Sequence, residues 1–375
     1  MKKLRAREAG IILPGTPGKY NAITDVKGVE VGYSTIIKGE PEDYTGMGSP
    51  FARTGVTAIL PRGHRRAAVF AGRHTLNGNG ELTGTHWIDD SGFMHGPFMI
   101  TNTNSVGVVR DTTSKWMIEN KYYYPLIVEG RPIDGCGYFY PAVGETWDGI
   151  MNDTNGFHVK AEHALEALNN AKSGPLEEGN VGGGTGMQCH QFKGGTGTAS
   201  RVLTEEEGGY TVGVLIQANH GFRPHFQVLG IPMADKISGA DPIINTFAPK
   251  PGTGSIIVVV ATDAPVLPWQ LSKLCRRVPI GIGAVGSGYE SGSGDIFLAF
   301  STANENAYSI SVSDVKLLGD DMIDPLYKAV AEAVEEAILN VLFAAETMVG
   351  REHNVFYALP QDQLLDVLRK YDKVR

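Results

Sequence analysis

The sequence predicts an α+β fold in which layers of β-sheet are covered by helices. Short apolar runs typical of buried strands recur along the chain, and compact glycine clusters separate them. The chain holds 48 glycines among 375 residues, nearly double the number expected at a usage of about 7%. A long stretch of helical periodicity near the C-terminus supplies a cover for such sheets.

The predicted strands are runs rich in β-branched and aromatic residues. They span residues 56–61, 67–72, 210–219, 256–260 and 295–302. The glycine clusters span residues 77–84, 179–186, 193–200 and 286–294. Because glycine tolerates close backbone approach and unusual dihedral angles, these clusters indicate crowded backbone at the ends of the strands.

Three segments carry the signals of helices. The longest begins with Asp324 as N-cap and Pro325 as first helical residue, and we expect it to stop at Gly350. Its apolar residues recur at helical spacing: Val330, Val334, Ala337, Ile338 and Val341. Shorter helices are expected within residues 158–174 and 268–278.

Composition narrows the class of protein. With 42% hydrophobic and 20% charged residues, the chain has ample material for a core. The net charge is −8 and the one short basic run is "RGHRR" at 62–66, so we expect no nucleic-acid partner. We find neither an apolar run long enough to span a bilayer nor the apolar core of a signal peptide. A cytoplasmic protein without a membrane partner is therefore expected.

The sequence also argues against several familiar sites. Cys136, Cys189 and Cys275 are scattered without C-x-x-C spacing, which favours free buried thiols over disulfides or zinc ligands. The segment "HGFRPH" (220–225) places two histidines close in sequence, but a third ligand is not nearby. Neither a G-x-S-x-G nor a phosphate-binding loop is found. We therefore expect no metal and no cofactor.

One small polar residue stands at the head of a buried strand. Ser255 precedes the apolar run in "PGTGSIIVVVATDAPVLP" (251–268). A serine hydroxyl needs a base, and the α-amino group of a first residue, with a pKa of about 8, can serve as one. For Ser255 this requires cleavage of the Gly254–Ser255 bond, by attack of the hydroxyl on the preceding carbonyl. An ordinary junction between loop and strand is the alternative interpretation.

The segment "GTGSIIVVVATDAPVLPWQL" (252–271) resembles the cleavage and nucleophile region of the P1 family (peptidase family S58) of self-processing serine aminopeptidases. This family includes the L-aminopeptidase/D-amidase/D-esterase and β-aminopeptidase group. The resemblance covers almost the whole chain. Its further blocks lie at residues 17–36, 80–109, 141–153, 192–201, 212–221 and 291–304.

The resemblance implies a single domain that cleaves itself into residues 1–254 and 255–375, which we expect to remain together. It implies that Ser255 is the nucleophile of maturation and turnover and that Asn219 donates to the oxyanion. Ser293 and Asp295 match the residues that contact the nucleophile and its amino group. Some relatives carry glutamate at the position of Asp295.

The resemblance also implies a pocket for a peptide, amide or ester with a free amine. Glu145 and Trp147 match pocket positions. An ion pair with a substrate ammonium strengthens in a partly dehydrated pocket, which favours Glu145 as its partner. Asp148, three residues on, is the rival for this role. The aromatic residue at Trp147 varies among relatives.

For the fold, the resemblance implies a four-layer αββα sandwich like that of N-terminal-nucleophile hydrolases, with a connectivity shared with ornithine acetyltransferase. A homo-oligomer, a tetramer by resemblance, is expected. Two alternatives stay open: a self-cleaving acyltransferase of the ornithine acetyltransferase type, and an uncleaved, non-catalytic protein that binds small molecules.

Overall fold

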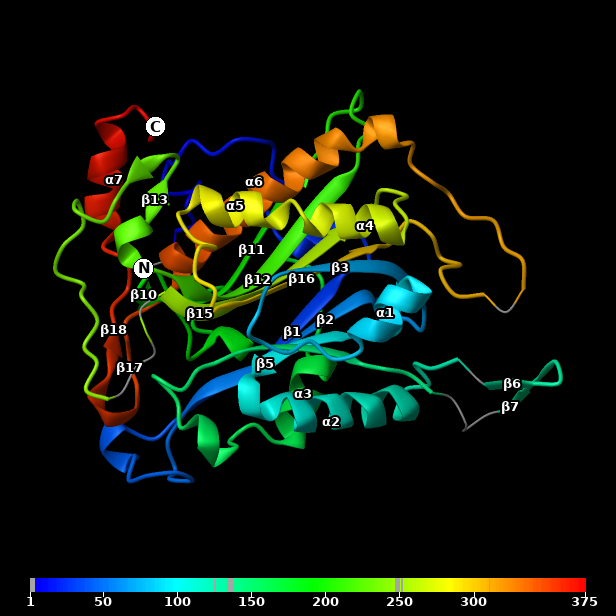
Figure 1. The fold of residues 1–375 in the computed structure, drawn as a ribbon, viewed down its shortest axis with the longest axis horizontal. Coiled ribbons are helices and arrows are strands. Elements are labelled where there is room, and N and C mark those ends of the chain that lie inside the picture. Colours follow the sequence, from blue (N-terminus) through cyan, green and yellow to red (C-terminus); the bar gives the residue numbers. More distant parts are fainter. Residues whose placement is uncertain (1–3, 125, 134–137, 247–249, 251, 310) are drawn as a thin grey trace.

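Two β-sheets lie face to face between helices (Figure 1). The computed structural model describes residues 4–124, 126–133, 138–246, 250, 252–309 and 311–375. The six-stranded sheet consists, in spatial order, of β11 (Gly195–Val202), β12 (Thr211–Gly221), β15 (Gly252–Thr262), β16 (Gly294–Ser301), β3 (Val69–Gly78) and β4 (Phe93–Met94). The four-stranded sheet consists of β1 (Glu30–Lys38), β2 (Ala52–His64), β5 (Phe98–Asn102) and β8 (Ala142–Thr146).

Helices cover the outer face of each sheet (Figure 1). The six-stranded sheet is covered by α4 (Pro268–Cys275), α5 (Val278–Ala284) and α6 (Asp324–Ala344). The four-stranded sheet is covered by α2 (Val106–Glu119) and α3 (Ala161–Asn169). Helix α1 (Thr85–Ser91) packs against β3 and β4, and α7 (Gln361–Arg369) contributes leucines to the core under α6. The predicted four-layer αββα sandwich is therefore confirmed.

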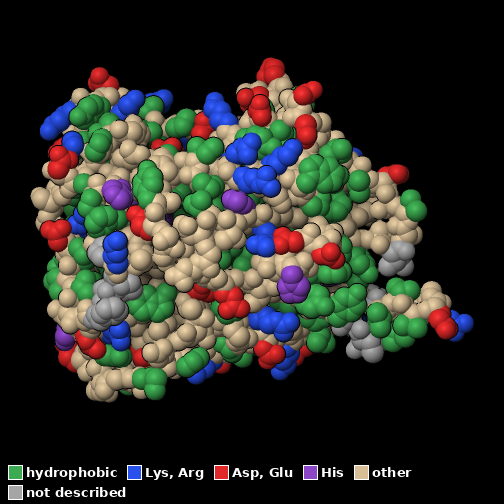
Figure 2. Space-filling model, in the orientation of Figure 1, with side chains coloured by type: hydrophobic (Ala, Val, Ile, Leu, Met, Phe, Trp, Pro, Cys, Tyr) green, Lys and Arg blue, Asp and Glu red, His purple; other side chains and the backbone are tan. Residues whose placement is uncertain are grey.

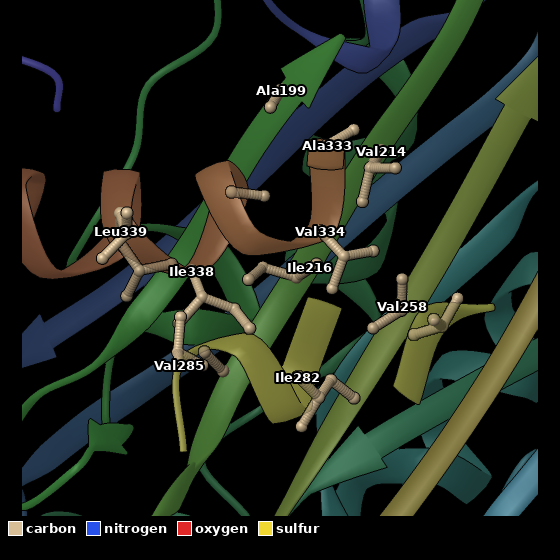
Figure 3. Close-up of a cluster of buried hydrophobic side chains, with 14 of the residues drawn as sticks. Ala199, Val214, Ile216, Val258, Ile282, Val285, Ala333, Val334, Ile338 and Leu339 are labelled. Atoms are coloured by element: carbon tan, nitrogen blue, oxygen red, sulfur yellow. The ribbon is translucent and has the colours of Figure 1, made fainter. Parts of the chain in front are cut away.

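Successive side chains of strand β15 point to opposite faces of the sheet and therefore contribute to two different cores. Ile256, Val258 and Val260 pack into the core beneath the helices, where Val258 lies near Ile282 of α5 and Val334 of α6 (Figure 3). Its other side chains, Ile257, Val259 and Ala261, pack into the core between the two sheets. Both faces of the strand are buried, so the sequence reads as an uninterrupted apolar run.

Within the described part of the chain, four short two-stranded hairpins lie outside the two large sheets. They are formed by β6 (Leu126–Val128) with β7 (Arg131–Ile133), β9 (Gln188–Cys189) with β10 (Phe192–Lys193), β13 (Gln227–Val228) with β14 (Ile231–Pro232), and β17 (Met348–Val349) with β18 (Val355–Phe356). The β6–β7 hairpin projects as an arm, seen at the right of Figures 1 and 2. Among the described residues, no helix is both long enough and apolar enough to cross a bilayer.

Three helix boundaries differ from the sequence predictions. Ile323, not Asp324, is the N-cap of α6, and the helix ends at Ala344 because the chain turns into β17 well before Gly350. The segment 268–278 reaches into two helices rather than one. Pro279 lies in the first turn of α5 and has no backbone N–H with which to extend α4. Helix α3 occupies only the middle of 158–174.

Candidate active site

Ser255 lies near the start of β15, in the interior of the six-stranded sheet. Its Cα is paired with Asn219 on the antiparallel strand β12 and with Gly294 on the parallel strand β16. Residues two apart on a strand share a face, so Ser255 is on the same side as Ile257, which packs between the sheets. The side chain is buried, and its Oγ donates a hydrogen bond to the Gly254 carbonyl oxygen at 2.6 Å.

Gly254 is glycine for a steric reason. A Cβ atom at this position would lie 2.0 Å from the carbonyl oxygen of Asn219, a distance that no side chain tolerates. The backbone before Ser255 therefore approaches β12 more closely than any other residue type allows.

Asn219 holds its amide group in a fixed orientation beside Ser255. Its Oδ1 accepts a hydrogen bond from the Gln188 backbone N–H at 3.1 Å, and its Nδ2 donates to the Trp147 carbonyl at 2.8 Å. The register of β12 against β15 shifts between Asn219 and Gly221, as at a β-bulge. Because an amide nitrogen carries two hydrogens, one N–H remains to serve a ligand.

Ser293 and Asp295 form a hydrogen-bonded pair on the other side of Ser255. Ser293 Oγ donates to Asp295 Oδ1 at 2.6 Å, and Asn77 Nδ2 donates to Asp295 Oδ2 at 2.8 Å. Burial raises the pKa of Asp295, while the hydrogen bonds from Ser293 and Asn77 lower it. Gly294, between the two residues, is the β16 partner of Ser255, which places the pair along the strand beside it.

Glu145 lies near the end of β8 with its carboxylate held at both oxygens. The backbone N–H of Glu81 donates to Oε1 at 2.8 Å, and the Thr103 hydroxyl donates to Oε2. Burial raises the pKa of Glu145, and these two hydrogen bonds oppose that shift. Gly80 completes the enclosure, because a Cβ there would lie 3.1 Å from Oε1.

These groups surround one cavity of about 480 Å³. Its lining includes Ser255, Asn219, Glu145, Trp147, Thr103 and Asn79. The structure therefore brings together four of the six side chains singled out from the sequence, and it buries the other two, Ser293 and Asp295, along the neighbouring strand.

Asp148, the rival of Glu145, is engaged elsewhere. Its Oδ2 accepts hydrogen bonds from the side-chain amides of Asn102 and Asn152, each at 3.0 Å. Its carbonyl oxygen accepts the backbone N–H groups of Met151 and Asn152. Burial raises the pKa of Asp148, and its hydrogen bonds oppose this. We assign Asp148 to bracing the turn that follows β8.

Sequence reasoning missed the residues that hold the site together, Asn77, Asn79, Thr103 and Gln188. Two of them stand inside the glycine cluster 77–84, which offered the usable signal. A Cβ at Gly294 would lie 2.3 Å from the Asn79 carbonyl oxygen, so this cluster and β16 meet in backbone contact. Thr103 and Gln188 carry no comparable signal, since tertiary packing alone brings them near Glu145 and Asn219.

The histidines of "HGFRPH" do not pair with each other. His220 is buried, with Nδ1 2.8 Å from Ser287 Oγ and its ring 5.6 Å from that of His190, whereas His225 lies beside Glu290. No three His, Cys, Asp or Glu side chains gather as metal ligands within the described ranges. Cys189 and Cys275 are free and buried. Cys136 lies outside the described residues.

A two-sheet sandwich between helices, with a serine near the start of a central strand and a carboxylate lining the same cavity, matches the fold and site expected of a hydrolase of the N-terminal-nucleophile type. The sequence model of peptidase family S58 matches residues 21–356. The chain belongs to this family and is a serine aminopeptidase.

Similar proteins with assigned activities or solved structures support this assignment to the serine aminopeptidases. A β-peptidyl aminopeptidase, BapA, from Sphingosinicella microcystinivorans is 48% identical over 99% of this chain and 93% of its own. The L-aminopeptidase D-Ala-esterase/amidase from Ochrobactrum anthropi is 44% identical, with a TM-score of 0.88 and complete coverage of both chains. That protein is described as a prototype of the serine aminopeptidases and a variant of the Ntn hydrolase fold.

A β-aminopeptidase from Burkholderia is 43% identical, with a TM-score of 0.83, covering 98% of this chain and 99% of its own. These three relatives are aminopeptidases or amidases. They favour the peptidase over the acyltransferase and the non-catalytic binding protein that the sequence left open.

Proposed function

We propose that the chain cleaves itself between Gly254 and Ser255 and then removes N-terminal residues from small peptides, amides or esters that carry a free amine. The observation that carries this proposal is the position of Ser255, flanked by Asn219 and facing Glu145 in one cavity. The names of the relatives support β-aminoacyl compounds as a substrate class.

Maturation begins at the contact between Ser255 Oγ and the Gly254 carbonyl group. The Oγ atom forms a bond to the carbonyl carbon, the bond from that carbon to the Ser255 nitrogen breaks, and the hydroxyl proton ends on the released amine. Water then hydrolyses the ester, which leaves a carboxylate on Gly254 and restores the Ser255 hydroxyl. The products are residues 1–254 and 255–375.

In turnover, the free α-amine of Ser255 takes the proton from Oγ as Oγ attacks the substrate carbonyl. We assign the remaining N–H of Asn219 to the developing oxyanion, because Asn219 is paired with Ser255 across the strands and lines the same cavity. The amine then returns the proton to the leaving group, and water hydrolyses the acyl-enzyme. We assign Ser293 and Asp295 to holding the α-amine, because they lie along the strand beside it.

Glu145 is proposed to bind the substrate ammonium. Two hydrogen bonds fix its carboxylate at the wall of the cavity that contains Ser255. Burial lowers the local dielectric, so an ion pair formed there is stronger than one in water. Trp147 forms the adjoining wall and presents an apolar surface to the substrate.

The experiment that tests this proposal combines intact-mass analysis with assays of hydrolysis on peptides, amides and esters that carry a free amine. Purified wild-type protein is expected as two fragments with a boundary after Gly254, and Ser255→Ala as one uncut, inactive chain. Ser255→Cys keeps a nucleophile and is expected to process. Activity in an uncut wild-type chain, or in the alanine variant, would contradict the proposal.

The assembly is proposed from the family resemblance alone, and the location from the expectation of the sequence analysis. We propose a homo-oligomer, with a tetramer as the expected state, that acts in the cytoplasm. Light scattering of the eluting peak in size-exclusion chromatography measures the assembly, and a monomeric peak at micromolar concentration would contradict it.

A further inference from the structure

A second, smaller cavity of about 90 Å³ adjoins the active-site cavity. Trp147, Asn219 and Thr253 line both cavities, so the two meet at the proposed oxyanion donor. Most of the remaining exposed wall of the smaller cavity is apolar, with side chains from Ile150, Pro242, Ile244 and Phe356. Its polar lining residues are Asp148, Gln188, Gln191 and Lys250. No step of the proposed mechanism uses this space.

The small cavity has a rigid frame. Buried Asn354 donates from Nδ2 to the Ile150 carbonyl at 2.8 Å and to Thr246 Oγ1 at 3.0 Å. Its Oδ1 accepts the Asn245 backbone N–H at 2.8 Å. One amide therefore ties together the turn after β8, the segment 242–246 and the start of β18.

Two adjacent isoleucines have opposite orientations in this frame. Ile243 exchanges two backbone hydrogen bonds with Val355, at 3.0 and 2.8 Å, which fixes the extended segment against β18. The side chain of Ile244 packs against the cluster formed by Met151, Met348 and Phe356, whereas that of Ile243 is 42% exposed. Of these two residues, Ile244 lines the cavity and Ile243 does not.

The positions of Glu145, Ser255 and Asn219 indicate which part of the substrate would reach the smaller cavity. Glu145 and Ser255 line the larger cavity, and the substrate amine is proposed to bind there. The reacting carbonyl then lies between Ser255 Oγ and the Asn219 amide. The group on the far side of that carbonyl continues past Asn219 and Trp147, where the smaller cavity opens.

We propose that this cavity binds the side chain of the leaving residue, the one released with the new amine, and that it selects a branched aliphatic side chain. This inference rests on the proposed function. A cavity of roughly 150 Å³ holds a benzene ring. A volume of about 90 Å³ is therefore better matched to the side chain of valine or leucine than to that of phenylalanine.

The test compares leaving groups behind one constant N-terminal residue. We use β-alanyl-leucine, β-alanyl-glycine and β-alanine amide with the matured enzyme. Added methylenes in an apolar pocket are worth roughly 10–200-fold in discrimination, so kcat/KM for the leucyl substrate is expected to exceed that for the glycyl substrate at least tenfold. Ile244→Asp is expected to reduce this ratio to about one, and Ile244→Ala to reduce it partly.

The matched control is Ile243→Asp, which places the same charge on the neighbouring exposed side chain and is expected to keep the wild-type ratio. A leucine-to-glycine ratio near one in the wild type would overturn the inference. So would an Ile244→Asp variant that alters discrimination among N-terminal residues instead of leaving groups.

Failure of the proposed function has a different signature. Self-cleavage and hydrolysis of β-alanine amide, which releases ammonia, require nothing in the small cavity. If both occur while the ratio is near one, the cavity assignment alone is wrong. If neither occurs, the proposed function and this inference are both wrong.

Discussion

Ser255 and Asn219 are directly paired across β15 and β12, and the register shifts immediately beyond Asn219. This pairing positions an amide donor next to a serine hydroxyl through backbone hydrogen bonds rather than through flexible loops. The same approach brings the Asn219 carbonyl oxygen so near Gly254 that a side chain cannot fit there. Cleavage and catalysis would therefore depend on one strand-to-strand contact.

Gly254→Ala is expected to slow or abolish self-cleavage. The added methyl group would lie 2.0 Å from the Asn219 carbonyl oxygen, so β15 must move away from β12 at the proposed scissile bond. The matched control is Gly283→Ala in α5, where a Cβ meets no atom within 4 Å. Intact-mass analysis over time should show uncut Gly254→Ala chains and normally cut Gly283→Ala chains; equal processing would contradict the steric argument.

Glu145→Gln is expected to lower kcat/KM for substrates with a free amine by roughly one to two orders of magnitude, the contribution of a charge-assisted hydrogen bond. Self-cleavage should survive, because it involves no substrate amine. The control is Glu119→Gln, which makes the same substitution at an exposed position of α2 outside the cavity and is expected to keep the wild-type kcat/KM.

The same site predicts a pH dependence. The α-amine of Ser255, with a pKa of about 8, gives kcat/KM a first decline as the pH decreases. Because burial raises the pKa of Glu145, a second acid limb should steepen this decline above the ordinary pKa of glutamate. Glu145→Gln should lack this acid limb. N-acetylated substrates should be refused by the wild type, and equal hydrolysis of acetyl-alanyl and alanyl p-nitroanilide would refute the role of Glu145.

Acid stability should depend on the buried imidazoles, among them His220 and His190. Burial lowers the pKa of His220 to about 4 and that of His190 well below its ordinary value. The unfolded chain binds these protons near pH 6.5 and the folded protein does not, so stability falls as the pH drops below about 6.5. For His220 the loss reaches about 3 kcal/mol near pH 4.

Thermal unfolding between pH 7 and pH 4 measures this decline. His220→Asn keeps a polar group toward Ser287 but removes one titrating ring, and it should flatten the curve. His353→Asn, at an exposed position, should follow the wild type. A wild-type Tm that is constant over this range would contradict the assignment of neutral, buried histidines.

Glu336→Gln is expected to weaken the association between the two proposed fragments and to lower the thermal stability of the protein. Glu336 on α6 is fully buried, and it pairs with Arg7 and Arg201, each at 2.8 Å, both of which belong to residues 1–254. Loss of one partner from a buried charge cluster costs about 3–5 kcal/mol. The Tm should fall accordingly, while Asp366→Asn, in an exposed pair with Arg369, should leave it unchanged.

Sequence alone was sufficient for the central strands and for the position of Ser255. A strand buried on both faces must be apolar throughout, so the run from Ile256 to Val260 left few alternatives, and one serine at its head was conspicuous. Helix boundaries were harder to predict from the sequence. Pro279 signals both a helix start and a helix break, and only its place in the first turn of α5 decides between them.

The choice between Glu145 and Asp148 shows why the site could not be completed from sequence. Both carboxylates follow the same apolar run, three residues apart. Their environments differ because Thr103 and Glu81 reach Glu145, whereas Asn102 and Asn152 reach Asp148. Asn102 and Thr103 are consecutive residues at the end of β5, Glu81 lies between β3 and α1, and Asn152 lies in the turn after β8. Which carboxylate each of them reaches is a property of the packed fold.

Cleavage after Gly254 would create a chain end of an unusual kind. Most N-terminal residues are mobile, and fixing the backbone of one residue costs roughly 1–2 kcal/mol of conformational entropy. Ser255 would instead begin its chain inside a sheet, with β12 on one side and β16 on the other. Its amine would be as well ordered as a side chain in the core, because folding of the precursor has already immobilised it. The sheet would thus turn a terminus, normally the least ordered part of a protein, into a rigid catalytic group.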